Sequence, residues 1–130
     1  MFAFVDTSAW VAYADLHERD TDRVGKALQE NGVLLLTSTF VLDETVTLLK
    51  RRLGHAAAVA VGDYLRSDEV ELMAVDDADV EAAWALFKAR GDKAYSFTDC
   101  TSFVLMRRLG LKDAIALDDD FRREGFRVKP

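Results

Sequence analysis

The 130-residue sequence has few of the residues that would assign it to several common protein classes. It has one cysteine, Cys100, and two histidines, so it can form neither an internal disulfide nor a four-ligand His/Cys zinc site. Its single proline is Pro130, and no linker, repeat or low-complexity segment divides the chain. We therefore expect a single domain over residues 1–130.

The sequence also lacks long apolar runs and an excess of positive charge. No segment approaches the roughly 20 apolar residues that cross a bilayer, and Phe2–Val5 is too short for a signal-peptide core. We expect a soluble, cytoplasmic protein that does not bind membranes. With 17 basic and 23 acidic residues, the net charge of −6 argues against a general nucleic-acid coat protein, since phosphate binding usually depends on Lys and Arg.

What the sequence does contain is an alternation of strand-like and helix-like segments. Short apolar runs predict strands at residues 2–5, 33–36, 70–75, 114–117 and 126–128. Helical spacing predicts helices at residues 8–14, 21–30, 38–53, 56–66, 78–89 and 97–109, with Trp84 and Phe87 facing the core. The alternation predicts an α/β fold whose mainly parallel sheet, of about four to five strands, is covered by helices on both faces.

Two acidic residues directly follow predicted strands. Asp6 follows the first strand and Asp118 follows the fourth. Because ligands of open α/β sheets bind beyond the carboxyl ends of the strands, we expect both at the same edge. Each also has a structural explanation, since Asp6 suits a helix N-cap and three successive acids suit a solvated turn. We assign Asp119 to that turn and expect Asp120 to lean toward Asp118.

Two further acidic residues lie on predicted helices beside apolar residues. Glu44 borders the apolar stripe of its helix, where a carboxylate is costly unless it is paired or metal-bound. Its neighbour Asp43 points to the solvated side. Asp99 begins a largely apolar helix, although it also fits a capping box with Ser96. The apolar surroundings of Asp99 favour a function, whereas Glu44 fits a surface role equally well.

Carboxylates from distant parts of the chain are thus predicted to meet at one edge of the sheet. Without a counter-charge they would repel one another and raise one another's pKa values. A divalent cation would resolve this repulsion, and ligands that are all oxygen suit Mg²⁺ or Mn²⁺. Such an ion activates water and stabilises the leaving oxygen, so we predict hydrolysis of phosphoesters.

Four short motifs follow one another along nearly the whole chain, from Phe4 to Phe121. They are Phe4-Val5-Asp6-Thr7-Ser8, Glu44 in the third helical segment, Tyr95-Ser96-Phe97-Thr98-Asp99, and Ala116-Leu117-Asp118-Asp119-Asp120-Phe121. With this order and spacing the sequence resembles the PIN domain family, and in particular its VapC-type toxin ribonucleases. One departure is Ala116, where the family often has Thr, which removes a hydroxyl but no ligand.

The resemblance implies a PIN α/β/α sandwich, often a homodimer, that acts as an Mg²⁺- or Mn²⁺-dependent endoribonuclease. The family's catalytic acids would be Asp6, Glu44, Asp99 and Asp118, the metal ligands would be Asp6, Asp99, Asp118 and Asp120, and the supporting hydroxyls would be Ser8 and Thr98. The resemblance also implies an RNA substrate and a VapB-type antitoxin that blocks the site. Trp10 and Tyr13, one helical turn apart, are candidate anchors for that partner, and core packing is their alternative.

Other functions remain open from the sequence. The chain could be a housekeeping RNA-processing PIN nuclease, or a PIN-like binding module without catalysis. A phosphoryl-accepting, receiver-like signalling domain has a similar length and strand order, but it needs an acidic pair after the first strand, where only Asp6 stands. Basic groups such as Lys50-Arg51-Arg52 are explained as well by a helix C-terminus as by RNA, so we assign none of them.

Overall fold

A five-stranded, entirely parallel sheet forms the centre of the computed structural model, which describes residues 1–130. The strands are β1 (Phe2–Val5), β2 (Leu34–Ser38), β3 (Val70–Met73), β4 (Asp113–Ile115) and β5 (Arg127–Lys129). Each lies at or beside a predicted strand. They are arranged in the order β3-β2-β1-β4-β5, so β1 is central. The predicted parallel α/β fold is confirmed.

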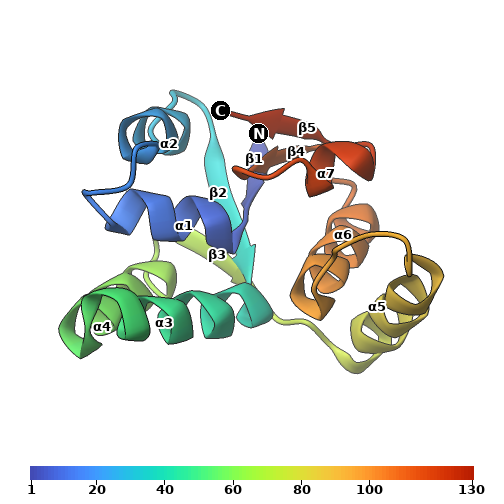
Figure 1. Ribbon diagram of the computed structural model, residues 1–130. Helices are drawn as coiled ribbons and strands as arrows, with labels where there is room; N and C mark the ends of the chain where they lie inside the picture. Colours follow the sequence, from blue (N-terminus) through green and yellow to red (C-terminus); the bar gives the residue numbers. More distant parts are fainter.

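Helices cover both faces of this sheet (Figure 1). They are α1 (Thr7–Ala14), α2 (Thr21–Leu28), α3 (Thr39–Leu53), α4 (His55–Leu65), α5 (Asp77–Ala89), α6 (Phe97–Leu109) and the short α7 (Asp120–Arg123). The first four lie on one side and the last three on the other. Only α7 was not predicted, because Asp119, the residue directly before its first residue Asp120, was assigned to a solvated turn. None of these helices has the length and apolar composition to span a membrane.

Side-chain caps fix where the helices that border the site begin. Asp6 caps α1 by accepting a hydrogen bond from the amide of Ser8, and Ser38 caps α3 by accepting one from Val41. Ser96 and Asp99 form a reciprocal capping box at the start of α6. Asp6 and Asp99 are therefore helix caps, which is the structural explanation that the sequence offered for each.

The core is densely aromatic around β1. The ring of Phe4 stacks on Phe121, and Phe103 meets Phe121 edge to face with ring centroids 4.9 Å apart. Trp10 is also part of this core, since it is only 1% exposed and its indole Nε1 donates to Thr37 Oγ1 at 3.4 Å. The prediction that Trp10 is a surface anchor for a partner is therefore wrong, because the residue faces the sheet.

The prediction that Trp84 and Phe87 face the core is also wrong. Helix α5 packs against α6 through its other side, where Ala83 is fully buried, and this leaves Trp84 50% exposed and Phe87 37% exposed. Their rings stack 5.7 Å apart, and Phe97 and Phe40 extend the group. We call these four residues the aromatic surface cluster.

Candidate active site

The strand order creates a crevice at the carboxyl ends of β1 and β4. After β1 the chain adds β2 and β3 on one side, whereas β4 and β5 lie on the other, so the chain reverses direction between β1 and β4. Ligands of open α/β sheets bind at such a switch point. A cavity of about 410 Å³ lies at this edge, and the four predicted catalytic acids Asp6, Glu44, Asp99 and Asp118 all line it.

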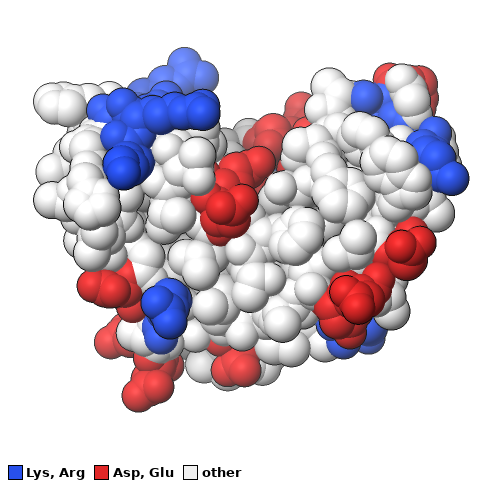
Figure 2. Space-filling model, turned by 90° about the horizontal axis from the view of Figure 1, so that it is seen from below, with Lys and Arg blue, Asp and Glu red and all other residues white.

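We call this space the acid cavity. Its acidic lining residues are Asp6, Glu18, Glu44, Asp99 and Asp118, and its only basic one is Arg52. Seen from the underside of the molecule, acidic side chains occupy a hollow, and a group of basic side chains lies to one side of it (Figure 2). The acid cavity therefore carries a local excess of negative charge, which suits a cation.

Asp6 is the most deeply placed of these acids, at 3% exposure. Its Oδ2 accepts hydrogen bonds from the Ser8 hydroxyl at 2.7 Å and from the Ser8 amide at 3.2 Å, but its buried Oδ1 has no partner. Burial raises the pKa of Asp6 to about 7, and the charges of Asp99 and Asp118 add to this although Ser8 opposes it. One carboxylate oxygen is therefore left free to bind a cation.

Asp99 faces the same cavity from the first turn of α6. Its Oδ2 accepts a hydrogen bond from the Ser96 amide at 2.9 Å. Burial raises the pKa of Asp99 to about 6, and the charges of Asp118 and Asp120 contribute although the hydrogen bonds from Ser96 lower it. Burial first, and then the charges of nearby acids, thus destabilise the anionic form of Asp99.

Asp118 completes the group from the segment after β4. Burial and the charges of Asp120 and Asp119 raise its pKa, while a hydrogen bond from the Asp120 amide and the charge of Arg123 lower it. Asp120 itself does not line the acid cavity, and its carboxylate pairs with Arg123 at 2.9 Å. Asp119 is exposed and pairs with Arg122, as its assignment to the surface predicted.

The two predicted supporting hydroxyls occupy different positions. Ser8 lines the acid cavity, and its hydroxyl donates to Asp6 while it accepts from the Leu117 amide at 3.1 Å. It therefore joins the segments that follow β1 and β4. Thr98 does not line the cavity. Ser8 is thus placed to orient a carboxylate, and the role of Thr98 stays a prediction.

Two charged lining residues were not identified from the sequence. Glu18 lies in the loop after α1, where no periodicity places a side chain. Arg52 is eight residues after Glu44 on α3, with Leu48 between them, so the three form one stripe that lines the cavity. The helical spacing was a usable signal for Arg52, but nothing in the sequence separated it from Lys50 and Arg51.

The residues of the acid cavity fit a hard divalent cation. The donors are all oxygen, one buried carboxylate oxygen lacks a partner, and burial together with the charges of nearby acids raises the pKa of Asp6, Asp99 and Asp118. No three acidic, histidine or cysteine side chains are close enough to hold one ion directly between them. This arrangement suits Mg²⁺ or Mn²⁺ with water among its ligands, since Mg²⁺ usually keeps several waters.

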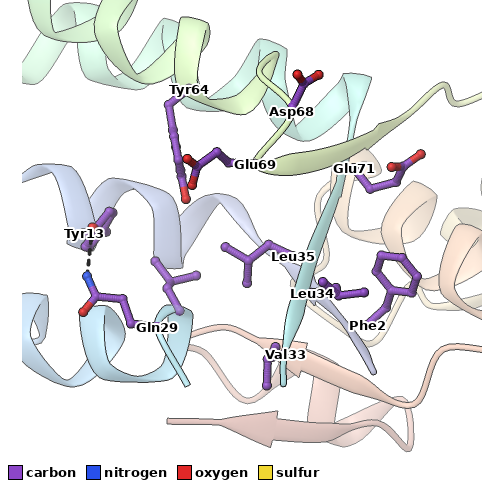
Figure 3. Close-up of a pocket in the computed structure, with 11 residues that line it drawn as sticks. Phe2, Tyr13, Gln29, Val33, Leu34, Leu35, Tyr64, Asp68, Glu69 and Glu71 are labelled. Atoms are coloured by element: carbon purple, nitrogen blue, oxygen red, sulfur yellow. Dashed lines mark hydrogen bonds between the residues drawn. The ribbon is translucent and has the colours of Figure 1, made fainter. Parts of the chain in front are cut away.

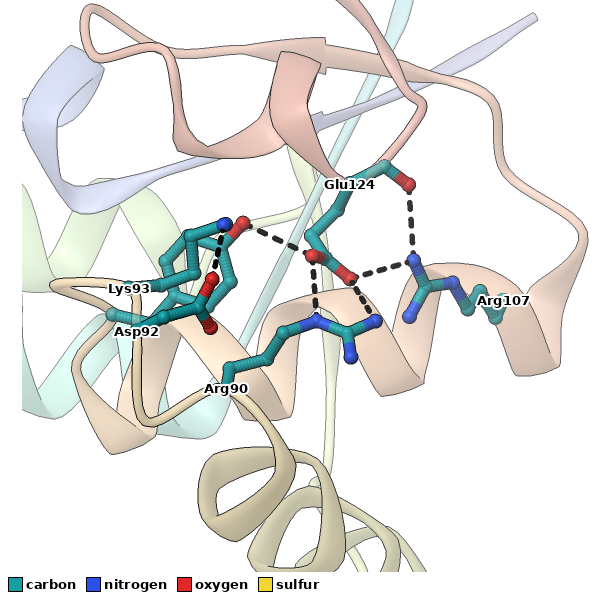
Figure 4. A network of polar contacts seen from close by, with 6 residues as sticks. Arg90, Asp92, Lys93, Arg107 and Glu124 are labelled. Carbon is teal, nitrogen blue, oxygen red and sulfur yellow. Dashed lines mark hydrogen bonds and ion pairs between the residues drawn. The ribbon is translucent and has the colours of Figure 1, made fainter.

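A second buried carboxylate, Glu124, lies close to the site but in a contrasting environment (Figure 4). Its side chain is 4% exposed and accepts hydrogen bonds from Arg90, Arg107 and the Tyr95 hydroxyl at 2.9–3.3 Å. Burial opposes its ionisation, but these bonds lower the pKa of Glu124 to about 2. The network ties the start of α6, which carries Asp99, to the segment that follows α7.

Known proteins are similar to this chain in both sequence and fold. The PIN domain family model matches residues 3–126. The chain is 38% identical over 128 residues to the 23S rRNA-specific endonuclease VapC20 of Mycobacterium tuberculosis, a match that covers 98% of each protein. It is 29% identical over 114 residues to ribonuclease VapC26 of the same organism, covering 88% of this chain and 84% of that protein.

Solved structures agree with these matches. The crystal structure of Mycobacterium tuberculosis VapC20, described as a sarcin–ricin loop cleaving toxin, matches over the full length of both chains with a TM-score of 0.93 and 37% identity. The VapBC2 structure from Rickettsia felis, bound to a promoter DNA fragment, matches with a TM-score of 0.73 and 12% identity over 99% of this chain and 98% of the other. The second similarity is one of fold alone.

Proposed function

The chain belongs to the PIN domain family, and from this premise we propose that it is an endoribonuclease of the VapC toxin type that uses Mg²⁺ or Mn²⁺. The observation that carries the proposal is the convergence of Asp6, Glu44, Asp99 and Asp118 on one cavity. None of the four forms an ion pair within the chain. Acids that were present only for stability would be expected to have such partners.

Each acid has a proposed role. A bound ion would supply an activated water and stabilise charge on the phosphate. Asp6, Asp99 and Asp118 would hold that ion partly through its bound waters, and Asp120 would add negative charge from outside the cavity. The Ser8 hydroxyl keeps one oxygen of Asp6 occupied, which directs the other toward the ion. Glu44, on the α3 wall, would accept a proton from the attacking water.

The substrate to test first follows from the relatives. VapC20 is named a 23S rRNA-specific endonuclease, and its structure is described as that of a sarcin–ricin loop cleaving toxin. We propose the same class of RNA target for this chain, because the match covers nearly all of both proteins. The alternative within the family, a housekeeping RNA-processing nuclease, would share the chemistry without arresting growth when it is expressed alone.

The decisive experiment is cleavage of 23S rRNA, and of an oligoribonucleotide with the sarcin–ricin loop, by the purified protein. We expect discrete cuts with Mn²⁺ or Mg²⁺ that disappear with EDTA and with Asp99→Asn. Asp119→Asn, a neighbouring exposed acid, is the matched control and should cut normally. Cleavage that survives EDTA or Asp99→Asn would contradict the proposal, and metal binding without cleavage of any RNA would favour the binding-only alternative.

An antitoxin partner is supported by a second surface, at the opposite edge of the sheet (Figure 3). A cavity of about 670 Å³ there has apolar walls that include the partly exposed Phe2 and Leu34, and Tyr13 lines it. The acids Asp68, Glu69 and Glu71 also line it. We propose that a VapB-type antitoxin segment with apolar and basic residues binds here, with Tyr13 as one of its contacts.

Helix α1 connects this cavity to the acid cavity. Thr7 at the start of α1 lines the acid cavity and Tyr13 near its end lines the second cavity, and about 9 Å of helix separates the two residues. A bound segment a few residues longer than the second cavity would therefore reach the acids. Tyr13→Ala should weaken co-purification with a co-expressed VapB-type antitoxin, whereas the exposed Asp22→Asn should not.

A homodimer is supported by the aromatic surface cluster. Exposed, contiguous aromatic rings commonly mark an interface, and Trp84 and Phe87 are the most exposed part of this group. We propose that a second copy of the chain covers them. Trp84→Glu should shift the protein to monomer in sedimentation velocity, whereas Leu16→Glu, at an isolated residue that is 82% exposed, should not.

A further inference from the structure

Arg52 is the one basic residue that lines the acid cavity. It is exposed, lies in the last turn of α3 and forms no ion pair. Five acids line the same cavity, yet the guanidinium is held by none of them. Arg52 is therefore not committed to neutralising the site, and its five N–H donors remain available.

The position of Arg52 along α3 relates it to the chemistry. Glu44, Leu48 and Arg52 follow one another at intervals of four residues on one side of α3, which forms a wall of the acid cavity. Glu44 and Arg52 are therefore about 12 Å apart along the helix axis. The acids Asp6 and Asp99 lie toward the sheet, and Arg52 lies at the outer end. This wall is negatively charged at the reacting end and positively charged where a substrate would extend out of the cavity.

RNA needs such a cation on this surface. The chain carries a net charge of −6, and the acid cavity adds a local concentration of carboxylates that repels a polyanion. A metal ion offsets this repulsion only at the phosphate that it binds. Phosphates farther along the strand need their own positive partner, and arginine binds phosphate through paired N–H donors.

Resting on the proposed nuclease function, we propose that Arg52 binds a backbone phosphate of the RNA substrate, a few nucleotides from the bond that is cut. The spacing along α3 corresponds to roughly three to four stacked nucleotides at 3.4 Å each. Arg52 then sets the direction in which the strand leaves the cavity. The neighbouring basic residues do not share this role, because Lys50 lines a separate cavity between α3 and α4 and Arg51 does not line the acid cavity.

The test compares Arg52→Gln with Arg51→Gln, a matched loss of charge one residue away. Both are introduced into Asp99→Asn protein, which binds RNA without cutting it, and the dissociation constant for a labelled sarcin–ricin stem-loop is measured from 50 to 300 mM NaCl. We expect Arg52→Gln to weaken binding about tenfold and to reduce the slope of log affinity against log salt by about 0.7–0.9. Arg51→Gln should change the affinity less than twofold.

A second arm measures cleavage in the otherwise unmodified protein. Arg52→Gln should raise KM about tenfold with little change in kcat on the full stem-loop, and Arg52→Lys should recover part of the loss. On an oligoribonucleotide trimmed to one nucleotide on each side of the cut, Arg52→Gln and the unmodified protein should be equal. Equal melting temperatures for all variants would exclude a folding effect, as expected for a side chain without a partner.

The outcomes separate the two proposals. If the unmodified protein cuts RNA but Arg52→Gln behaves like Arg51→Gln in affinity and salt slope, the assignment of Arg52 is wrong and the nuclease stands. If the loss is equally large on the trimmed substrate, Arg52 acts at the reacting phosphate and not at a distant one, which also overturns the assignment. If the unmodified protein neither binds nor cuts RNA, the proposed function itself fails.

Discussion

Two buried carboxylates in this protein, those of Glu124 and Asp6, have opposite electrostatic environments. Glu124 is held by two arginines and a tyrosine, and its pKa falls to about 2. Asp6 is at least as buried but has only the hydrogen bonds of Ser8, and its pKa rises to about 7. Burial alone therefore does not decide whether a carboxylate stabilises the fold or binds a ligand. A carboxylate with cationic partners stabilises the fold, and one surrounded by other acids is available for a ligand.

Asp6→Asn is the strongest test of the difference between Asp6 and Glu124. It should lower the rate of RNA cleavage by about 1000-fold or more, because a proposed ligand of the metal ion loses its charge. The metal-free protein should unfold at the same temperature or a higher one, since a buried repulsive charge is removed. Cleavage assays with calorimetry in EDTA check both parts. A large loss of metal-free stability would mean that Asp6 is held by interactions beyond those of Ser8.

The second prediction concerns pH. In EDTA, the free energy of unfolding should fall as the pH rises from about 4 to 7, because the folded state retains a proton on Asp6 that the unfolded state has already released. A shift from 3.8 to about 7 corresponds to a loss on the order of 4 kcal/mol. Asp99, with a pKa of about 6, acts in the same direction. Urea unfolding at several pH values measures the slope.

The control is Asp6→Asn, in which most of this dependence of stability on pH should disappear. Mn²⁺ should also reverse the loss of stability at higher pH, because an ion that binds only the folded state stabilises that state by mass action. Metal-free stability that rises between pH 4 and 7 would contradict the assigned pKa values.

Glu124→Gln tests whether the paired carboxylate stabilises the fold. It should lower the free energy of unfolding by about 2 kcal/mol, because two arginines lose their shared anion while remaining partly in solvent. The stabilisation by Glu124 is complete above pH 4.5 and is lost as the pH falls toward 2, the reverse of the Asp6 effect. Denaturant titrations measure it. Asp92→Asn, which removes an exposed pair with Lys93, is the control and should leave the free energy of unfolding nearly unchanged.

The smallest predicted effect is that of Ser8→Ala. Loss of the hydroxyl removes a bond to Asp6 and a bond from the Leu117 amide, so we expect about 1 kcal/mol of destabilisation at pH 5 and roughly tenfold slower cleavage. Ser67→Ala, whose hydroxyl bonds the Tyr64 carbonyl far from the site, is a matched control for stability and should cleave normally. Equal cleavage by both variants would show that Ser8 does not orient Asp6.

The sequence was sufficient for much of the site because its acids follow strands or begin a helix. A strand end and a helix start are local features, so Asp6, Asp99 and Asp118 could be placed at one edge without knowing the strand order. The strand order could not be predicted from the sequence, since β1 pairs with β4 through a crossover that no local sequence pattern encodes. The position of Glu18 depends on a loop path, for which the sequence gives no periodic signal.

The errors have a common physical cause. Trp10 and Trp84 are both large apolar residues on helices, and periodicity identifies an apolar face without identifying what covers it. Helix α1 lies against the sheet and buries Trp10, whereas α5 packs mainly on α6 and leaves Trp84 half exposed. Tertiary packing thus determines whether each tryptophan is buried or exposed.

The Ser8–Leu117 hydrogen bond joins residues 109 positions apart, and this separation has a consequence for the time at which the enzyme becomes active. A ribosome makes the chain from its N-terminus, so Asp6 exists long before β4 and Asp118 emerge. Until they do, the cavity lacks one wall, and the growing chain carries no assembled nuclease centre. The ribosome that is translating this protein therefore finishes nearly the whole chain before that chain can act on RNA.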